Sequence, residues 1–197
     1  MFIQTEQTPN PATLKFLPGR EVMAAAGSGA GPSSAEFTDP DEARRLSPLA
    51  GRVFGVDGVG GVYLGADFVS VTKHEGQEWH LLKPAVLGAI MEHYLTGEPA
   101  VHEAALLAER GGAPGGAAPE DDEAVKRIKE LLETRVRPAV AQDGGDITFY
   151  GFERGVVYLN MQGACSGCPS SVVTLKNGIE NLLRYYVPEV VEVRAVS

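Results

Sequence analysis

Two cysteines stand three positions apart near the end of the sequence, and the chain contains no others. Cys165 and Cys168 lie in the segment GACSGCPSS, which is otherwise made of glycine, serine, alanine and proline. A close cysteine pair in a reducing compartment is typical of metal binding or dithiol redox chemistry, because two thiols are too few for a disulfide framework. An inert buried pair is the alternative, and the spacing within a Gly/Ser loop disfavours it.

The pair directly precedes a predicted helix. Pro169 suits the first helical position, which would make Cys168 the N-cap residue. Apolar residues then recur at helical spacing, at Val172, Leu175, Ile179, Leu182, Leu183 and Tyr186. Helix N-termini favour the thiolate, the form of cysteine that binds metal. Ser166 and Gly167 add little bulk, so we expect both sulfurs to be accessible.

Counting ligands leaves three kinds of site open, namely a redox dithiol, a zinc site and an iron-sulfur site. A thioredoxin-like enzyme would place a larger α/β unit after the pair, whereas one helix and one strand follow here. A structural zinc ion and a four-iron cluster each need four ligands, and this chain supplies two cysteines. A symmetric dimer would complete either set, because each copy contributes the same half-site.

The elements that must position the pair form a small α+β domain over residues 121–197. An amphipathic helix is marked by Val125, Ile128, Leu132, Val136 and Val140. The segment DGGD at residues 143–146 follows it, and glycine there can adopt the left-handed conformation that ends helices. Strands at 147–152 and 156–161 are joined by residues 153–155, and a last strand at 190–196 follows Pro188.

A second α+β domain is predicted over residues 1–102, with a mobile loop at residues 24–34. Its predicted elements are a strand at 12–17, helices starting after Asp39 and Ser47, two strands around residues 65–67, and a helix ended by Gly97. Residues 103–120 are rich in glycine, alanine and proline and are predicted to be a flexible linker. The four histidines, His74, His80, His93 and His102, show no metal-ligand spacing, so we expect surface or partly buried positions without chemistry.

Charge and hydropathy exclude several classes of protein. The formal net charge is −9, which disfavours nucleic-acid binding, and no apolar run approaches the length of a membrane span. The glycines of GVDGVGG and GSGAG do not match a nucleotide-binding motif. Because no targeting segment is visible, we expect a cytoplasmic protein.

Several of these segments resemble one family. The run RPAVAQDGGDI at residues 137–147, the cysteine loop and TLKNGIE at residues 174–180 resemble the C-terminal domain of NifU and the Nfu family of iron-sulfur carriers. The run QTEQTPNPATLKF at residues 4–16 and SPLA at residues 47–50 resemble the Nfu N-terminal domain.

The resemblance implies a scaffold without catalytic turnover. It implies that Cys165 and Cys168 of two subunits hold a [4Fe-4S] cluster, that iron-sulfur assembly donors load it, and that apo iron-sulfur proteins receive it. It leaves open whether [2Fe-2S] or [4Fe-4S] predominates and whether the apo form is a dimer. The family also occurs in mitochondria behind a transit peptide, and because none is visible here we expect a bacterial, cytoplasmic member, with a processed mitochondrial form as the alternative. A dithiol-disulfide oxidoreductase and a zinc-bridged interaction module are the alternatives.

Overall fold

The computed structural model describes residues 2–23, 34–110, 123–166 and 169–196. The chain divides into two compact units, residues 1–111 and 112–197. Both contain helices and an antiparallel or mixed sheet, as the predicted α+β class requires. None of the described helices combines the length and apolar character that a membrane span needs.

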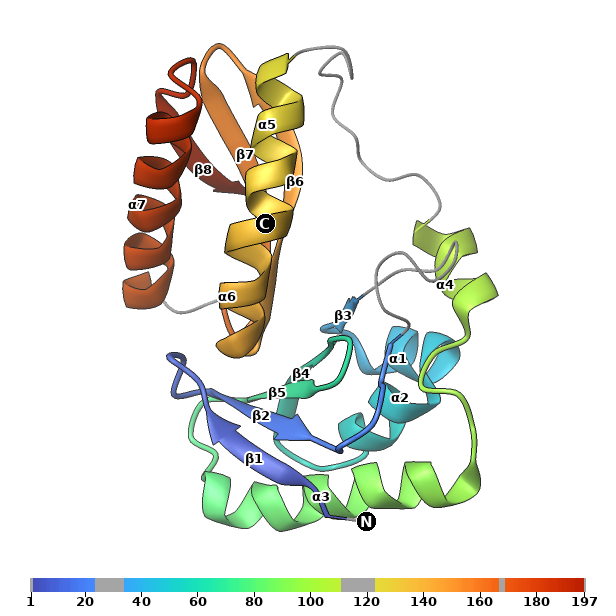
Figure 1. The fold of residues 1–197 in the computed structure, drawn as a ribbon. Coiled ribbons are helices and arrows are strands. Elements are labelled where there is room, and N and C mark those ends of the chain that lie inside the picture. The colour runs from blue at the N-terminus through green and yellow to red at the C-terminus, as the bar shows by residue number, and fades with distance from the viewer. Residues whose placement is uncertain (1, 24–33, 111–122, 167–168, 197) are drawn as a thin grey trace. The chain divides into compact units, whose positions relative to one another are not determined.

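The first unit packs helices against a five-stranded antiparallel sheet (Figure 1). In chain order its elements are β1 (Gln4–Gln7), β2 (Thr13–Leu17), β3 (Ala35–Phe37), α1 (Pro40–Leu46), α2 (Pro48–Phe54), β4 (Val59–Leu64), β5 (Val69–Lys73), α3 (Trp79–Thr96) and α4 (Glu103–Arg110). The strand order is β1-β2-β5-β4-β3, so β1 and β3 are the edges. Helix α3 buries Leu82, Val86 and Ile90 toward this unit's core.

The helix starts in the first unit confirm the capping pattern of the sequence. The Asp39 carboxylate accepts hydrogen bonds from the backbone N–H groups of Asp41 and Glu42 at 2.8 Å each. The Ser47 hydroxyl accepts one from Ala50 N at 2.9 Å and donates one to Ala100 O at 2.6 Å. These side chains satisfy backbone donors that a helix start otherwise leaves without partners.

One part of the first unit differs from the sequence expectations. Helix α4 occupies residues 103–110 of the predicted linker, and its Leu106 is 1% exposed. Apolar burial therefore extends the first unit beyond residue 102, and the remaining linker residues, 111–120, lie outside the described residues. Residues 24–33 of the predicted mobile loop lie outside them as well.

His93 was expected at the surface or partly buried, and that expectation is wrong, because its side chain is fully buried on α3. Neither ring nitrogen has a hydrogen-bond partner within the part of the chain that the structure describes. Burial lowers the pKa of His93 below its usual value, the charge of Arg52 lowers it further, and Glu98 opposes both. The folded protein therefore holds this ring neutral.

This burial predicts an acid-sensitive first unit. Below its ordinary pKa of about 6.5, the imidazole takes up a proton in the unfolded chain before it does so in the folded one. The free energy of unfolding of the first unit is therefore expected to fall as the pH drops from about 7 to about 5. His93→Leu is expected to flatten that slope in urea titrations at each pH. Equal slopes for the two proteins would contradict the assignment.

The second unit places two helical segments on one face of a three-stranded sheet (Figure 1). Its elements are α5 (Glu123–Leu131), the π-helical turn η1 (Leu132–Val136), α6 (Arg137–Gln142), β6 (Gly145–Glu153), β7 (Val156–Gly163), α7 (Pro169–Tyr186) and β8 (Glu192–Val196). Strands β6 and β7 are antiparallel, whereas β7 and β8 are parallel. Helix α7 is thus the crossover of a βαβ unit.

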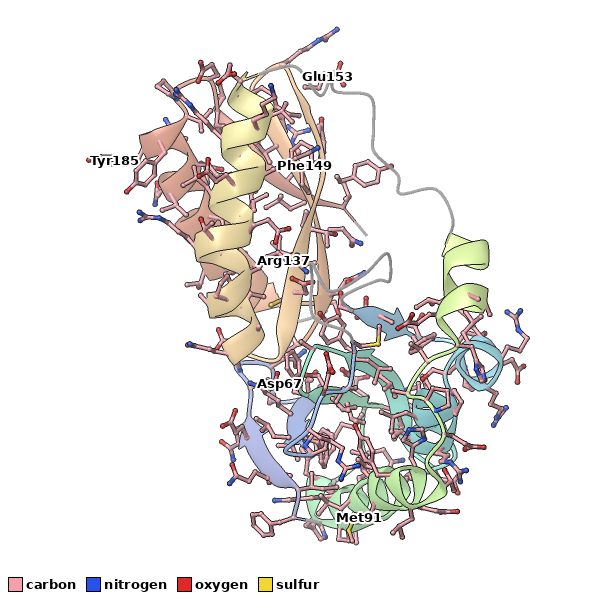
Figure 2. All side chains as sticks on the ribbon, turned by 45° about the vertical axis from the view of Figure 1, so that its right-hand side comes forward. Asp67, Met91, Arg137, Phe149, Glu153 and Tyr185 are labelled. Atoms are coloured by element: carbon pink, nitrogen blue, oxygen red, sulfur yellow. The ribbon has the colours of Figure 1, made fainter. Side chains whose placement is uncertain are left out.

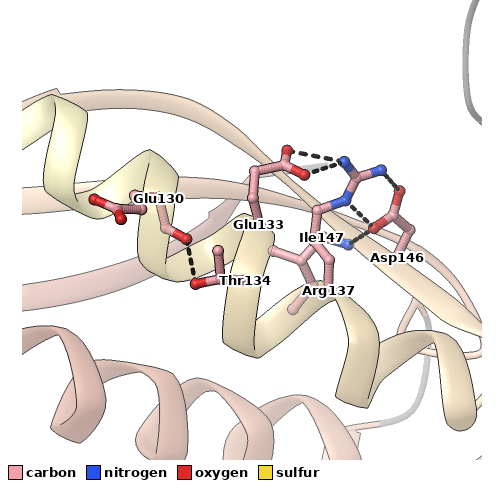
Figure 3. A network of polar contacts seen from close by, with 6 residues as sticks. All are labelled: Glu130, Glu133, Thr134, Arg137, Asp146 and Ile147. Atoms are coloured by element: carbon pink, nitrogen blue, oxygen red, sulfur yellow. Dashed lines mark hydrogen bonds and ion pairs between the residues drawn. The ribbon is translucent and has the colours of Figure 1, made fainter. Parts of the chain in front are cut away.

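The wider turn η1 coincides with a proline in the helix. Pro138 has no N–H to donate and its ring would crowd the carbonyl group of Thr134 in a regular α-helix. The backbone N–H of Arg137 instead reaches back to Leu132 O, five residues earlier. The Thr134 hydroxyl donates to Glu130 O at 2.7 Å (Figure 3). This turn lets the helix continue to the segment that packs against the cysteine loop.

Candidate functional site

The cysteine loop connects the carboxyl end of β7 to the start of α7. Gly163 ends the strand with a left-handed φ of 66°. Its carbonyl oxygen then accepts hydrogen bonds from the Ser166 backbone N–H at 3.0 Å and from the Ser166 hydroxyl at 2.8 Å. The carboxyl ends of parallel strands in crossover units are where α/β proteins bind ligands, so the loop lies at a typical binding position.

Cys165 is less accessible than the sequence indicated. Its residue is only 5% exposed and belongs to the core of the second unit. The sequence argument considered only the small neighbours within the loop, whereas the first residues of β6 cover the cysteine from across the sheet. The predicted N-cap residue Cys168 and Gly167 lie outside the described residues.

The two glycines of DGGD have separate tasks. Gly144 has a φ of 79°, which confirms the predicted left-handed end of the helix. Its carbonyl oxygen accepts a hydrogen bond from Ala164 N at 3.1 Å, which ties the cysteine loop to β6. A β-carbon built on Gly145 would lie 2.6 Å from the sulfur of Cys165 and 2.8 Å from Gln162 O. Only glycine therefore fits at Gly145 without displacing the cysteine or the strand.

Gly145→Ala is expected to move Cys165 and to destabilise the second unit by about 1–3 kcal/mol, the usual cost of overpacking. Gly151→Ala is the matched control, because it lies in the same strand and a β-carbon there would meet no atom within 4 Å. The measurements are urea unfolding and the rate of thiol alkylation by iodoacetamide. Indistinguishable stability and alkylation rates for the two variants would contradict this role of Gly145.

An ion-pair network holds the start of β6 in place (Figure 3), and Figure 2 shows its central residue, Arg137, within the second unit. Arg137 donates to both carboxylate oxygens of Asp146, at 2.8 and 2.7 Å, and to both oxygens of Glu133, at 2.8 and 2.9 Å. The Asp146 carboxylate also accepts a hydrogen bond from Ile147 N at 2.8 Å. The hydrogen bond to Asp146, its charge and that of Glu133 raise the pKa of Arg137, while burial opposes them, so the guanidinium stays charged.

Sequence reasoning missed this network. The charged residues stand nine positions apart in RPAVAQDGGD, so the segment itself contained the signal, but no local rule pairs a helix residue with a strand residue at that distance. Within the described part of the chain, no group of three or more histidine, cysteine, aspartate or glutamate side chains could hold a metal ion. The assignment of Cys165 and Cys168 as metal ligands stays a prediction.

Family models match both halves of the chain. Residues 3–97 match the model described as "Scaffold protein Nfu/NifU N terminal", and residues 128–194 match the NifU-like domain. A solution structure of a NifU-like protein from Saccharomyces cerevisiae is 28% identical, covers 52% of this chain and 86% of that one, and has a TM-score of 0.45.

Curated relatives match over the whole chain. Proteins named "NFU1 iron-sulfur cluster scaffold homolog, mitochondrial" from Drosophila erecta and Drosophila virilis are 51% and 49% identical over 196 residues, or 100% of this chain. The chain spans 65% and 62% of the length of these two relatives.

The relatives correct the expected location. We expected a bacterial, cytoplasmic protein, and that expectation is wrong, because the similar proteins are named as mitochondrial. The expectation rested on the residues at the start of this sequence. Those residues give no information about location when the chain matches only part of its relatives' length. The two family models match one after the other along the chain, and the relatives align with the whole of it. The chain therefore belongs to the Nfu family, in which an Nfu N-terminal domain precedes a NifU-like domain.

Proposed function

We propose that this chain is a scaffold that binds a [4Fe-4S] cluster between two copies and transfers it to apoproteins. Cys165 and Cys168 of each copy would supply the four thiolates. The observation that carries the proposal is the ligand count, since the chain has two cysteines at C-x-x-C spacing and no others. The relatives named as iron-sulfur cluster scaffolds support the choice of cargo, and their location supports a mitochondrial site of action.

The position of the loop suits a shared cluster. It follows the carboxyl end of β7 and precedes the 18-residue helix α7, whose N-terminal backbone N–H groups favour negative charge nearby. A loaded cluster carries thiolate ligands, so a helix start is a favourable environment for it. Two copies related by a two-fold axis would present identical half-sites to the same cluster.

Burial of Cys165 couples binding to a local rearrangement. Its sulfur packs against Gly145 in this structure, so four thiolates can meet between two chains only if the loop separates from β6. The backbone hydrogen bond from Ala164 to Gly144 is the contact that this separation would break. Cluster binding then includes the cost of opening the loop, which keeps the holo dimer less stable than a preformed site would be.

Transfer follows from the same arrangement. Each iron-thiolate bond to this chain breaks as a thiolate of the acceptor protein takes its place, so ligands are exchanged and no electron is required. A cluster held between subunits becomes exposed when they separate. Weak association between the two copies therefore favours transfer of the cluster to an acceptor over its retention by this chain.

The test is anaerobic reconstitution of the full chain with iron and sulfide. We expect a brown dimer with about four irons and four sulfides for each pair of chains, together with activation of apo-aconitase when the loaded protein is added. A colourless monomer that reduces disulfides would support the oxidoreductase instead. Zinc retained at the cysteines of protein isolated without oxygen, with no cluster transfer, would support the zinc-bridged module.

A further inference from the structure

A groove in the first unit lies far in sequence from the cysteine loop and has no part in the proposed cluster chemistry. Its volume is about 500 Å³, and it runs between the edge strand β1 and the first turn of α3. Eight residues of the segment 4–16 line it, together with Trp79, His80 and Lys83. Most of the QTEQTPNPATLKF segment thus forms one wall and the floor.

The wall is preorganised by its own hydrogen bonds. The Thr8 hydroxyl donates to Asn10 O or to Thr13 O, each at 2.9 Å, and the Asn10 side chain accepts from Ala12 N at 3.0 Å. Across the groove, the Trp79 indole N–H donates to Pro11 O at 3.1 Å, which fastens the loop to α3. A ligand that enters this groove therefore needs little reordering of the loop, which favours binding.

The groove is open to a further strand. Among the residues that the structure describes, β1 is an edge strand that pairs with β2, over the register from Gln4 opposite Leu17 to Gln7 opposite Leu14. An edge strand presents a row of backbone donors and acceptors on its outer side, and peptides can add there as a further strand. The Thr5 and Gln7 side chains project from β1 into the groove, so a strand added beside β1 would direct alternate side chains to the same side.

The side chains that line the groove favour a partner with acidic side chains. The chain has 26 acidic and 17 basic residues, yet the groove is lined by Lys83 and His80 and by no carboxylate. Neither of these two side chains has an ion-pair partner among the residues that the structure describes. Glu6, the acidic residue of β1, lies on the other face of the strand and pairs with Lys15 at 3.3 Å. An acidic side chain in the groove would thus gain a cation without meeting repulsion.

We propose that this groove binds an acidic segment of a partner protein in extended conformation. The segment adds beside β1 and directs alternate side chains, which carry carboxylates, toward Lys83 and His80. This assignment goes beyond the proposed carrier function and holds whether or not the chain binds a cluster. It gives the first unit a binding task of its own.

Trp79 is the single tryptophan of the chain and lines the groove, so its fluorescence reports occupancy directly. The probe is an eight-residue peptide with blocked ends that alternates valine and glutamate. We expect a saturable change in Trp79 emission, with an affinity about tenfold higher than for the same peptide with glutamine in place of glutamate. Lys83→Gln is expected to remove about tenfold of the affinity for the glutamate peptide.

Two controls separate specific binding from general attraction. Lys126→Gln removes the same charge from the second unit and is expected to leave the affinity unchanged. N-methylation of the valine amides and of the glutamate amides blocks opposite edges of the peptide, so one version should bind and the other should not. Equal affinity for the two peptides, equal effects of the two lysine variants, or binding by both methylated versions would overturn the proposal.

Discussion

Replacing Cys165 or Cys168 with serine is expected to abolish cluster binding and the cluster-dependent dimer. In a dimer of either variant, two thiolates remain where a four-iron cluster needs four. A serine hydroxyl does not replace them, because it is a poor metal ligand at neutral pH. Reconstituted protein should therefore be colourless and should retain less than about one tenth of the wild-type iron, and size-exclusion chromatography should show no dimer attributable to the cluster.

The control for these variants is Ser166→Ala. Ser166 lies between the cysteines and donates its hydroxyl hydrogen to Gly163 O, so this variant alters the loop while it keeps both thiols. We expect it to bind nearly the wild-type amount of iron. If the double cysteine variant still activates apo-aconitase with cluster, the site lies elsewhere and the proposed ligand set is wrong.

Asp146→Ala is expected to cause the largest loss of stability, about 3 kcal/mol in the free energy of unfolding of the second unit. The Asp146 side chain is 7% exposed and its Arg137 partner 20%. Removing the carboxylate leaves a largely buried guanidinium without its strongest partner and leaves Ile147 N without its acceptor. Unfolding in urea, followed by circular dichroism, should show a shifted transition for the second unit only.

Glu133→Ala provides the matched control. Glu133 contacts the same guanidinium with equally short hydrogen bonds, but its side chain is 59% exposed. Exposed ion pairs contribute about 1 kcal/mol or less, because water and salt screen them. Comparable losses for the two variants would show that burial of Asp146 does not control the stability of this network.

Asp146 also affects the cluster site through the backbone. It follows Gly145, whose close approach to Cys165 depends on the position of the start of β6. Because the loop must separate from β6 before it binds a cluster, we expect Asp146→Ala to lower the cost of that opening and to raise cluster retention under conditions in which the unit stays folded. Unchanged retention at full folding would limit the role of the network to stability.

Local chemistry predicted most of the elements. The N-caps Asp39 and Ser47, the left-handed glycines Gly97 and Gly144, and the turn at Arg154 act through contacts within a few residues, so the sequence displays them. Strands β1 and β3 were missed for the opposite reason. β1 reads QTEQ without apolar alternation and β3 has three residues, and only pairing with distant strands makes them part of the sheet.

The sequence by itself determined the set of candidate ligands. Two cysteines at a fixed spacing before a helix limit the thiolates that one chain can supply. Only the tertiary structure decided how accessible Cys165 is. The parallel pairing of β7 with β8 makes α7 a crossover helix, and the approach of β6 covers Cys165 with Gly145. Both depend on contacts between residues far apart in the chain, as do the burial of His93 and the groove beside Trp79. The spacing of apolar residues along the chain predicts which side chains are buried. It does not predict which distant segment of the chain packs against them.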